Sequence, residues 1–137
     1  MIVVDASVAV KWLLPETGAD AAQRLLDSGE RLLGPALIRV EVAAAIARKS
    51  RFGEMDPQDA ATAVDLWFQS IRDGVITLFP DAVDLPRGFR LALELRHPVQ
   101  DCLYLALAER LGAPLVTADE KFVTRAGAPH PAVRALA

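Results

Sequence analysis

Cysteine is nearly absent from this sequence, because Cys102 is the only one among 137 residues. A lone cysteine excludes an internal disulfide and a zinc site built from several cysteines. Long apolar runs are also missing, since uncharged apolar runs such as 42–47 and 102–108 fall far short of the ~18 residues that a membrane-spanning helix needs. Asp5 and the lack of an early basic segment argue against a signal peptide. We therefore expect a protein of the reducing cytoplasm.

An excess of positive charge is missing as well. Fifteen basic residues stand against 18 acidic ones, which gives a formal net charge of −3. A protein that binds nucleic acid through nonspecific phosphate contacts is usually basic, so such contacts here have to be local or assisted by a metal ion. Twelve of the 15 basic residues are arginine. This favours forked contacts with phosphate or carboxylate groups, although genome composition alone explains it equally well.

Several motifs of common enzyme families are absent. The chain has no G-x-G-x-x-G, no G-x-x-x-x-G-K-[ST] and no G-x-S-x-G, so it shows no sign of a dinucleotide site, a P-loop or a hydrolase elbow. Ser7 stands where an aspartyl-phosphate phosphatase would place its second aspartate. The two histidines, His97 and His130, each adjoin a proline and lack metal-ligand spacing, so we interpret both as structural.

The pattern that is present is an alternation of short apolar strands with helical segments. It indicates an α/β fold in which a parallel sheet lies between two layers of helices, within a single domain over 1–137. Two consecutive helices at about 35–73 are expected to project as a helical hairpin. Its apolar face, with Trp67 and Phe68, either contacts a partner or packs within the chain's own core. Strands are predicted at 2–4, 31–34, 75–79, 114–117 and 133–136.

Local signals set the expected helix boundaries. Ser7 is expected to cap the first helix, and Thr17 with Asp20 matches a T-x-x-D capping box for the second. Asp56 followed by proline predicts a cap with proline in the first turn. Later helices are predicted at about 87–96 and 98–111.

Two aspartates follow predicted strands. Asp5 comes directly after the strand at 2–4, and Asp119 follows the strand at 114–117. In open parallel sheets, ligands bind beyond the carboxyl ends of the strands where the strand order reverses. The two carboxylates can therefore meet, although each taken alone is also a common cap of a turn or helix.

Two further carboxylates stand in apolar surroundings. Buried glutamates are rare unless paired, so Glu41 belongs either to a polar site or to an ion pair with an arginine of another element. Asp101 opens the apolar helix CLYLALA, where a carboxylate also favours the helix dipole. The helical neighbours of Glu41 at three and four residues on either side are all apolar: Leu37, Ile38, Ala44 and Ala45.

Convergence of these four carboxylates would define a cation site. Two like charges about 5 Å apart repel by about 3 kcal/mol at an effective dielectric constant of ~20, so a group of four needs raised pKa values or a bound cation. Oxygen ligands without cysteine or histidine select a hard ion, Mg²⁺ or Mn²⁺. Such an ion commonly serves phosphate chemistry, and hydrolysis of a phosphodiester bond is then the natural reaction.

The same residues carry a resemblance to a known family. Asp5-x-Ser7 after the opening strand, Glu41 in a helix, Asp101 before CLYLALA, and LVTAD ending at Asp119 resemble the PIN-domain ribonucleases. The stretches DASVAVKWLLPE and LVTADEKF resemble the VapC toxins of bacterial and archaeal toxin–antitoxin modules, and the resemblance covers essentially the whole chain. It implies a Rossmann-like parallel sheet in the order 3-2-1-4-5. It also implies a Mg²⁺- or Mn²⁺-dependent endoribonuclease that hydrolyses RNA with a metal-activated water.

The resemblance also implies residue roles and partners. A cognate antitoxin that occupies the site, a homodimer, and toxin–antitoxin complexes built from two dimers are expected. Hydroxyls of Ser7 and Thr117 would orient the carboxylates or water. The catalytic and metal-binding residues would be Asp5, Glu41, Asp101 and Asp119.

The chain departs from many members of the family beside the third acid. Gln100 and Cys102 stand where tyrosine and alanine are common, which leaves the metal site intact but puts substrate contacts there in doubt. We interpret Cys102 as a small buried hydrophobe, and Glu120 as a solvated neighbour of the cluster.

Two other functions stay open from the sequence. The chain could be a PIN nuclease that processes RNA or DNA without being a toxin. It could also be a non-catalytic module that binds a partner and uses its acids in ion pairs. The basic cluster Arg48, Lys49 and Arg51 fits RNA phosphates, an acidic antitoxin tail or a solvated helix C-terminus equally well.

Overall fold

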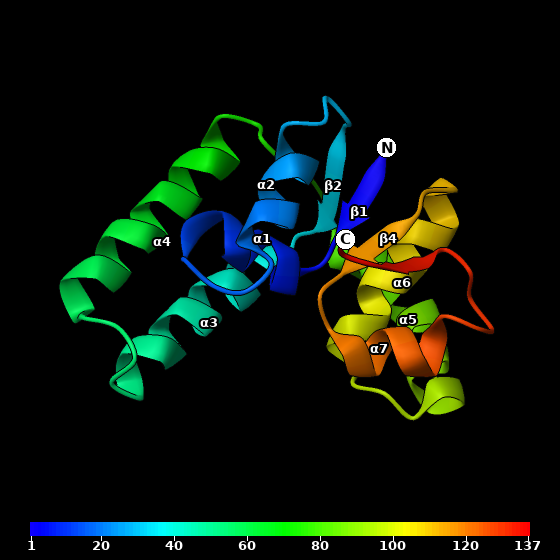
Figure 1. Ribbon diagram of the computed structural model, residues 1–137. Coiled ribbons are helices and arrows are strands. Elements are labelled where there is room, and N and C mark those ends of the chain that lie inside the picture. The colour runs from blue at the N-terminus through cyan, green and yellow to red at the C-terminus, as the bar shows by residue number, and fades with distance from the viewer.

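A computed structural model describes residues 1–137 and places five parallel strands in one sheet. The strand order is β3-β2-β1-β4-β5, so β1 lies at the centre, between β2 and β4 (Figure 1). The predicted α/β class and the order 3-2-1-4-5 are confirmed. The strands are β1 (Ile2–Val4), β2 (Leu32–Pro35), β3 (Thr77–Phe79), β4 (Leu115–Thr117) and β5 (Val133–Ala135).

Helices cover both faces of this sheet, as the apolar strands require. Helices α5 and α6 pack against each other, and α6 contacts β1, β2 and β4, while α1 and α2 lie across the sheet from them (Figure 1). Helices α3 and α4 project as the predicted hairpin. The helices are α1 (Ala6–Leu13), α2 (Ala19–Leu26), α3 (Ile38–Arg51), α4 (Pro57–Arg72), α5 (Asp81–Leu95), α6 (Val99–Leu111) and α7 (Glu120–Ala126).

The core is built around α6, whose residues 102–108 are all buried. An ideal Cβ at Gly88 of α5 would stand 3.3 Å from the Leu103 Cα, so the missing side chain lets α5 and α6 approach closely. On the hairpin, Trp67 is fully buried and donates its indole N–H to the Arg39 carbonyl, whereas Phe68 is exposed. The Trp67 part of the expected partner surface therefore belongs to the chain's own core.

Two expected helix caps are wrong and one is confirmed. Ser7 lies inside α1, because the N-cap position is Asp5. The expected capping box of Thr17 and Asp20 does not form, since α2 begins after Gly18, whose positive φ of 89° turns the chain into the helix. The Asp56 side chain caps α4 through the Gln58 N–H, as predicted.

The helix predicted from about residue 87 begins earlier, at Asp81. It includes Pro86, which lies before the predicted start. Pro86 is the sixth residue of α5, in its second turn, so the helix continues through it without the backbone hydrogen bond that this residue would otherwise donate to the Ala82 carbonyl. No helix is both long and apolar enough to cross a membrane.

Candidate functional site

Four carboxylates meet at the carboxyl edge of the sheet, where the strand order reverses at β1. Asp5 joins β1 to α1, and Asp119 joins β4 to α7. Glu41 and Asp101 lie in the first turns of α3 and α6. We call Asp5, Glu41, Asp101 and Asp119 the acid cluster. The topology thus places all four residues that the sequence singled out at one edge of the sheet, where the charge of each acts on at least one other. The group of three or more potential ligands whose atoms lie within 4.8 Å of one another is His97, Asp101 and Asp119.

The charges of the acid cluster act on one another. Burial raises the pKa of Asp5, and the charge of Asp101 raises it further, against hydrogen bonds from hydroxyl groups that lower it. Burial also raises the pKa of Glu41, with added contributions from Asp5 and Asp101. Burial is again the largest cause of the raised pKa of Asp101, and the charge of Asp119 raises this pKa further. Carboxylate oxygens of Asp101 and Asp119 lie within 4.8 Å of each other.

Two hydroxyl groups hold Asp5 in place. Thr117 donates to Asp5 Oδ2 at 2.6 Å, and Ser7 donates to the same oxygen at 3.0 Å. Each hydroxyl oxygen is itself fixed by a backbone donor at 3.0 Å, Asp119 N–H for Thr117 and Ala118 N–H for Ser7. The predicted supporting residues therefore lie against the first carboxylate and link it to the segment that carries the fourth.

A buried tyrosine, missed from the sequence, holds Glu41. The Tyr104 hydroxyl donates to Glu41 Oε1 at 2.6 Å, and burial raises the pKa of Tyr104, so it remains a donor. Tyr104 lies three residues after Asp101, on the same face of α6. This spacing was the available signal, although a tyrosine in an apolar run is commonly a core residue. Asp81 was also missed, and its charge contributes to the raised pKa of Glu41.

His97 forms a hydrogen bond with Asp101. Its Nε2 lies 2.7 Å from Asp101 Oδ2, and Arg125 Nη1 lies 3.1 Å from its Nδ1. Because arginine only donates, Nδ1 is the acceptor and Nε2 carries the proton that is donated to Asp101. The His97 ring also stacks on Phe122 at 4.6 Å between centroids. The ring lies close enough to Asp101 and Asp119 to share a metal, but both its nitrogens are already engaged.

Each carboxylate of the acid cluster takes these hydrogen bonds on one oxygen. In Asp119 that oxygen is Oδ1, which accepts the backbone N–H groups of Lys121 and Phe122 at the start of α7. Side chains held on one oxygen have a fixed orientation and can offer the other oxygen to a ligand. The bonded oxygens are Asp5 Oδ2, Glu41 Oε1, Asp101 Oδ2 and Asp119 Oδ1.

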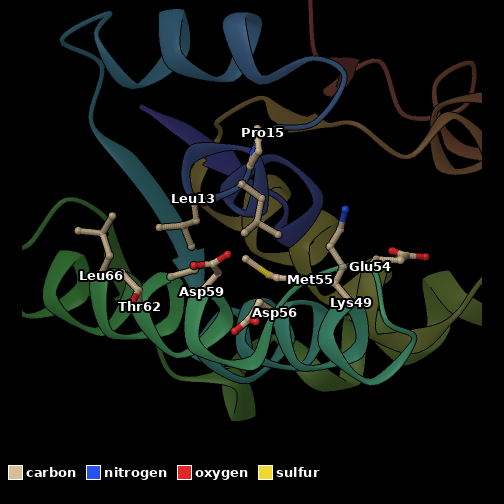
Figure 2. A pocket seen from close by; sticks show the side chains of 11 residues that line it. Leu13, Pro15, Lys49, Glu54, Met55, Asp56, Asp59, Thr62 and Leu66 are labelled. Carbon is tan, nitrogen blue, oxygen red and sulfur yellow. The ribbon is translucent and has the colours of Figure 1, made fainter.

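Two hollows flank α1, and they differ in their relation to the acid cluster. One, of about 590 Å³, reaches Thr117 and is also lined by Lys11, Glu120 and Thr124. The other, of about 540 Å³, lies between the end of α1 and the α3–α4 hairpin (Figure 2). Figure 2 shows Met55 pointing into this second hollow. None of the four acids lines either hollow, but Thr117, which donates to Asp5, lines the first. Only the first hollow adjoins the acid cluster.

Two other residues discussed from the sequence have no direct part in the cluster's hydrogen bonding. Cys102 is fully buried, and burial raises the pKa of its thiol to about 11, so it stays a neutral hydrophobe. Glu120 is solvent-exposed at the start of α7.

Comparison with known proteins agrees with this geometry. The PIN domain family matches residues 2–128. Ribonuclease VapC12 of Mycobacterium tuberculosis is 35% identical over 128 residues, which cover 93% of each chain. The chain therefore belongs to the PIN-domain family and, within it, to the VapC ribonucleases.

Solved structures share the fold at lower identity. The crystal structure of M. tuberculosis VapC20, a sarcin–ricin loop cleaving toxin, has a TM-score of 0.68 at 17% identity. That match covers 90% of this chain and 94% of VapC20. A toxin–antitoxin complex from Klebsiella pneumoniae contains a chain with a TM-score of 0.63 at 15% identity, covering 98% of this chain and 96% of that one. These likenesses support the architecture.

Proposed function

We propose that this chain is a metal-dependent endoribonuclease and the toxin of a toxin–antitoxin module. Its catalytic and metal-binding residues are the four members of the acid cluster, supported by Ser7 and Thr117. The observation that carries the proposal is the convergence of four carboxylates, three with raised pKa values, at the sheet edge where parallel α/β folds bind ligands. Such mutual repulsion is relieved by a bound cation.

The donor set fits Mg²⁺, for which Mn²⁺ substitutes. All candidate ligand atoms are carboxylate oxygens, which hard cations prefer, and each side chain is oriented by a partner on its other oxygen. Bound Mg²⁺ would supply a water of lowered pKa and neutralise the charge that develops on the phosphate. Glu41, with its raised pKa and one oxygen free of the Tyr104 bond, is suited to take the proton of the attacking water.

The comparisons support RNA as the substrate and a protein antitoxin as the partner. The curated relative is named a ribonuclease, and the Klebsiella structure is a toxin–antitoxin complex. We further propose a single cytoplasmic domain that acts as a homodimer, with two dimers joining in the antitoxin complex. Val40 and Phe68 line an exposed apolar hollow on the hairpin that a protein partner can cover.

A cleavage assay on purified variants tests the catalytic proposal. The wild-type chain should cut a mixed RNA pool with Mg²⁺ or Mn²⁺ and stop when EDTA is added, whereas Asp5→Asn should fold and not cut. Asp65→Asn serves as the control, because this carboxylate is exposed on α4 and forms no ion pair. Metal-dependent cleavage by Asp5→Asn at the wild-type rate would remove Asp5 from the mechanism.

Expression in a bacterium separates a toxin from an RNA-processing nuclease. Inducing the wild-type chain should arrest growth, and Asp5→Asn or co-expression of a small gene located immediately upstream should relieve the arrest. Normal growth under induction, with cleavage intact in the tube, would favour the processing role.

A further inference from the structure

The face of α3 that carries Glu41 continues outward into a cationic and aromatic surface. Residues seven apart on an α-helix lie within about 20° of the same direction, so Arg48 follows Glu41 two turns later, about 10 Å along the axis. Phe52 ends the helix one turn beyond Arg48, and small side chains, Ala44 and Ala45, lie between. Figure 1 shows α3 running from the edge of the sheet to the tip of the projecting hairpin.

The side chains at the end of this helix include arginines without an acidic partner and an exposed aromatic ring. The guanidinium groups of Arg48 and Arg51 stand over the Phe52 ring, 5.4 and 5.2 Å from its centroid. Phe52 is 61% exposed, and neither arginine forms an ion pair. Lys49, by contrast, is already paired with Glu16 at 2.8 Å. An exposed cation–π contact contributes only about 0.5–1 kcal/mol, so a ligand can readily replace it.

We propose that Arg48, Arg51 and Phe52 form a binding track for single-stranded RNA that leads away from the acid cluster along α3. Arg48 and Arg51 contact backbone phosphates, and Phe52 stacks on an unpaired base. The inference rests on the proposed nuclease function and adds to it the form of the substrate and the helix along which the substrate is held.

An unpaired RNA strand fits this surface better than an acidic peptide. Two arginines would serve a carboxylate or a phosphate equally, but an exposed aromatic ring between them provides a stacking face for a base. The rest of the chain is net acidic, so the attraction for phosphate has to be local, and here it is confined to one helix end. At about 3.4 Å per stacked nucleotide, Arg48 lies about three nucleotides from the position of Glu41.

Binding measurements on the full-length Asp5→Asn chain test the track without cleavage. Fluorescence anisotropy with a labelled 12-nucleotide single-stranded RNA should show affinity reduced by about tenfold in Arg48→Ala and in Phe52→Ala. Arg48→Ala should also lower the slope of log affinity against log salt concentration by about 0.7, whereas Phe52→Ala should leave it unchanged. Phe52→Tyr should restore binding, because the ring is kept.

Matched controls come from exposed residues on α5. Phe89 is 54% exposed, and Arg90 next to it is also exposed. Phe89→Ala and Arg90→Ala therefore remove an exposed aromatic ring and an exposed arginine from a helix outside the track. Unchanged RNA affinity and salt slope in the two track variants would overturn the proposal. A loss of affinity for a polyglutamate peptide, with RNA binding intact, would assign the surface to an acidic protein instead.

Cleavage separates failure of the track from failure of the nuclease. In the wild-type background, both track variants should raise KM and leave kcat close to the parent value. If the wild-type chain cuts RNA but the variants bind and cut as it does, the track alone is refuted. A wild-type chain that cuts no RNA with Mg²⁺ or Mn²⁺ would refute the proposed function and the track together.

Discussion

Neutralising Asp101 should stabilise the chain in the absence of metal and remove its response to metal. Oxygens of Asp101 and Asp119 lie within 4.8 Å, which corresponds to a repulsion of about 3 kcal/mol at an effective dielectric constant of ~20. The Asp101 side chain is 22% exposed, so solvent screening should reduce the gain to about 1–2 kcal/mol. An asparagine oxygen can still accept the hydrogen bond that His97 Nε2–H donates. A domain of this size should then melt about 4–8 °C higher.

Thermal unfolding with EDTA and with Mn²⁺ measures both effects. With EDTA, Asp101→Asn should melt above wild type. At a Mn²⁺ concentration 100-fold above its dissociation constant, wild type should gain about 2.7 kcal/mol, and Asp101→Asn should gain much less, so the order reverses. Asp65→Asn, which removes an exposed carboxylate of α4, should follow wild type in both conditions.

An opposite pattern would refute the reasoning. If Asp101→Asn melted below wild type in EDTA, its charge would be compensated inside the protein and would not be available to a cation. If it kept the full Mn²⁺ response, the ion would bind elsewhere.

Three further predictions follow from the same contacts. Tyr104→Phe should fold and lose about 1–3 kcal/mol of stability, because it lacks the 2.6 Å hydrogen bond to Glu41. It should also bind Mn²⁺ more weakly in calorimetric titration, and an unchanged Mn²⁺ affinity would contradict a supporting role for Tyr104. Gly88→Ala should cost about 1–3 kcal/mol in urea unfolding, because its Cβ would lie 3.3 Å from the Leu103 Cα; a stability equal to wild type would show that α5 can move away. The three carboxyls of raised pKa, Asp5, Glu41 and Asp101, bind protons more tightly in the folded state than in the unfolded state. With EDTA, their contribution to the free energy of unfolding should therefore increase as pH falls from 7 towards their unfolded pKa values. Adding Mn²⁺ should weaken this trend, and a stability that rises with pH in EDTA would contradict it.

The fold was predictable because the strands are short and apolar and alternate with helices. Parallel topology then places the carboxyl ends of strands along one edge, so Asp5 and Asp119 could be brought together from the sequence. Glu41 was recognisable because a carboxylate surrounded by apolar helical neighbours needs a polar partner. The order of the sheet came from the family resemblance, since strand pairing depends on contacts between distant segments.

The supporting residues were harder to predict for the same reason. Tyr104 reaches Glu41 across 63 positions of sequence, and the pairing depends on where the sheet places α3 and α6. His97 was interpreted as structural from its neighbouring proline, although it stands four residues before Asp101 and donates to it. The start of α5 was missed because the helix continues through Pro86 in its second turn, where a proline removes a backbone hydrogen bond and usually ends or kinks a helix.

The central claim is that the acid cluster holds a divalent cation on its free oxygens. Anomalous diffraction from a crystal soaked in Mn²⁺ tests this directly. The structure predicts one or more manganese peaks about 2.1 Å from oxygens of the four carboxylates, chiefly those that accept no hydrogen bond within the protein, with His97 remaining bonded to Asp101. A well-ordered crystal with no peak at the cluster, or with manganese only at a distant site, would contradict it.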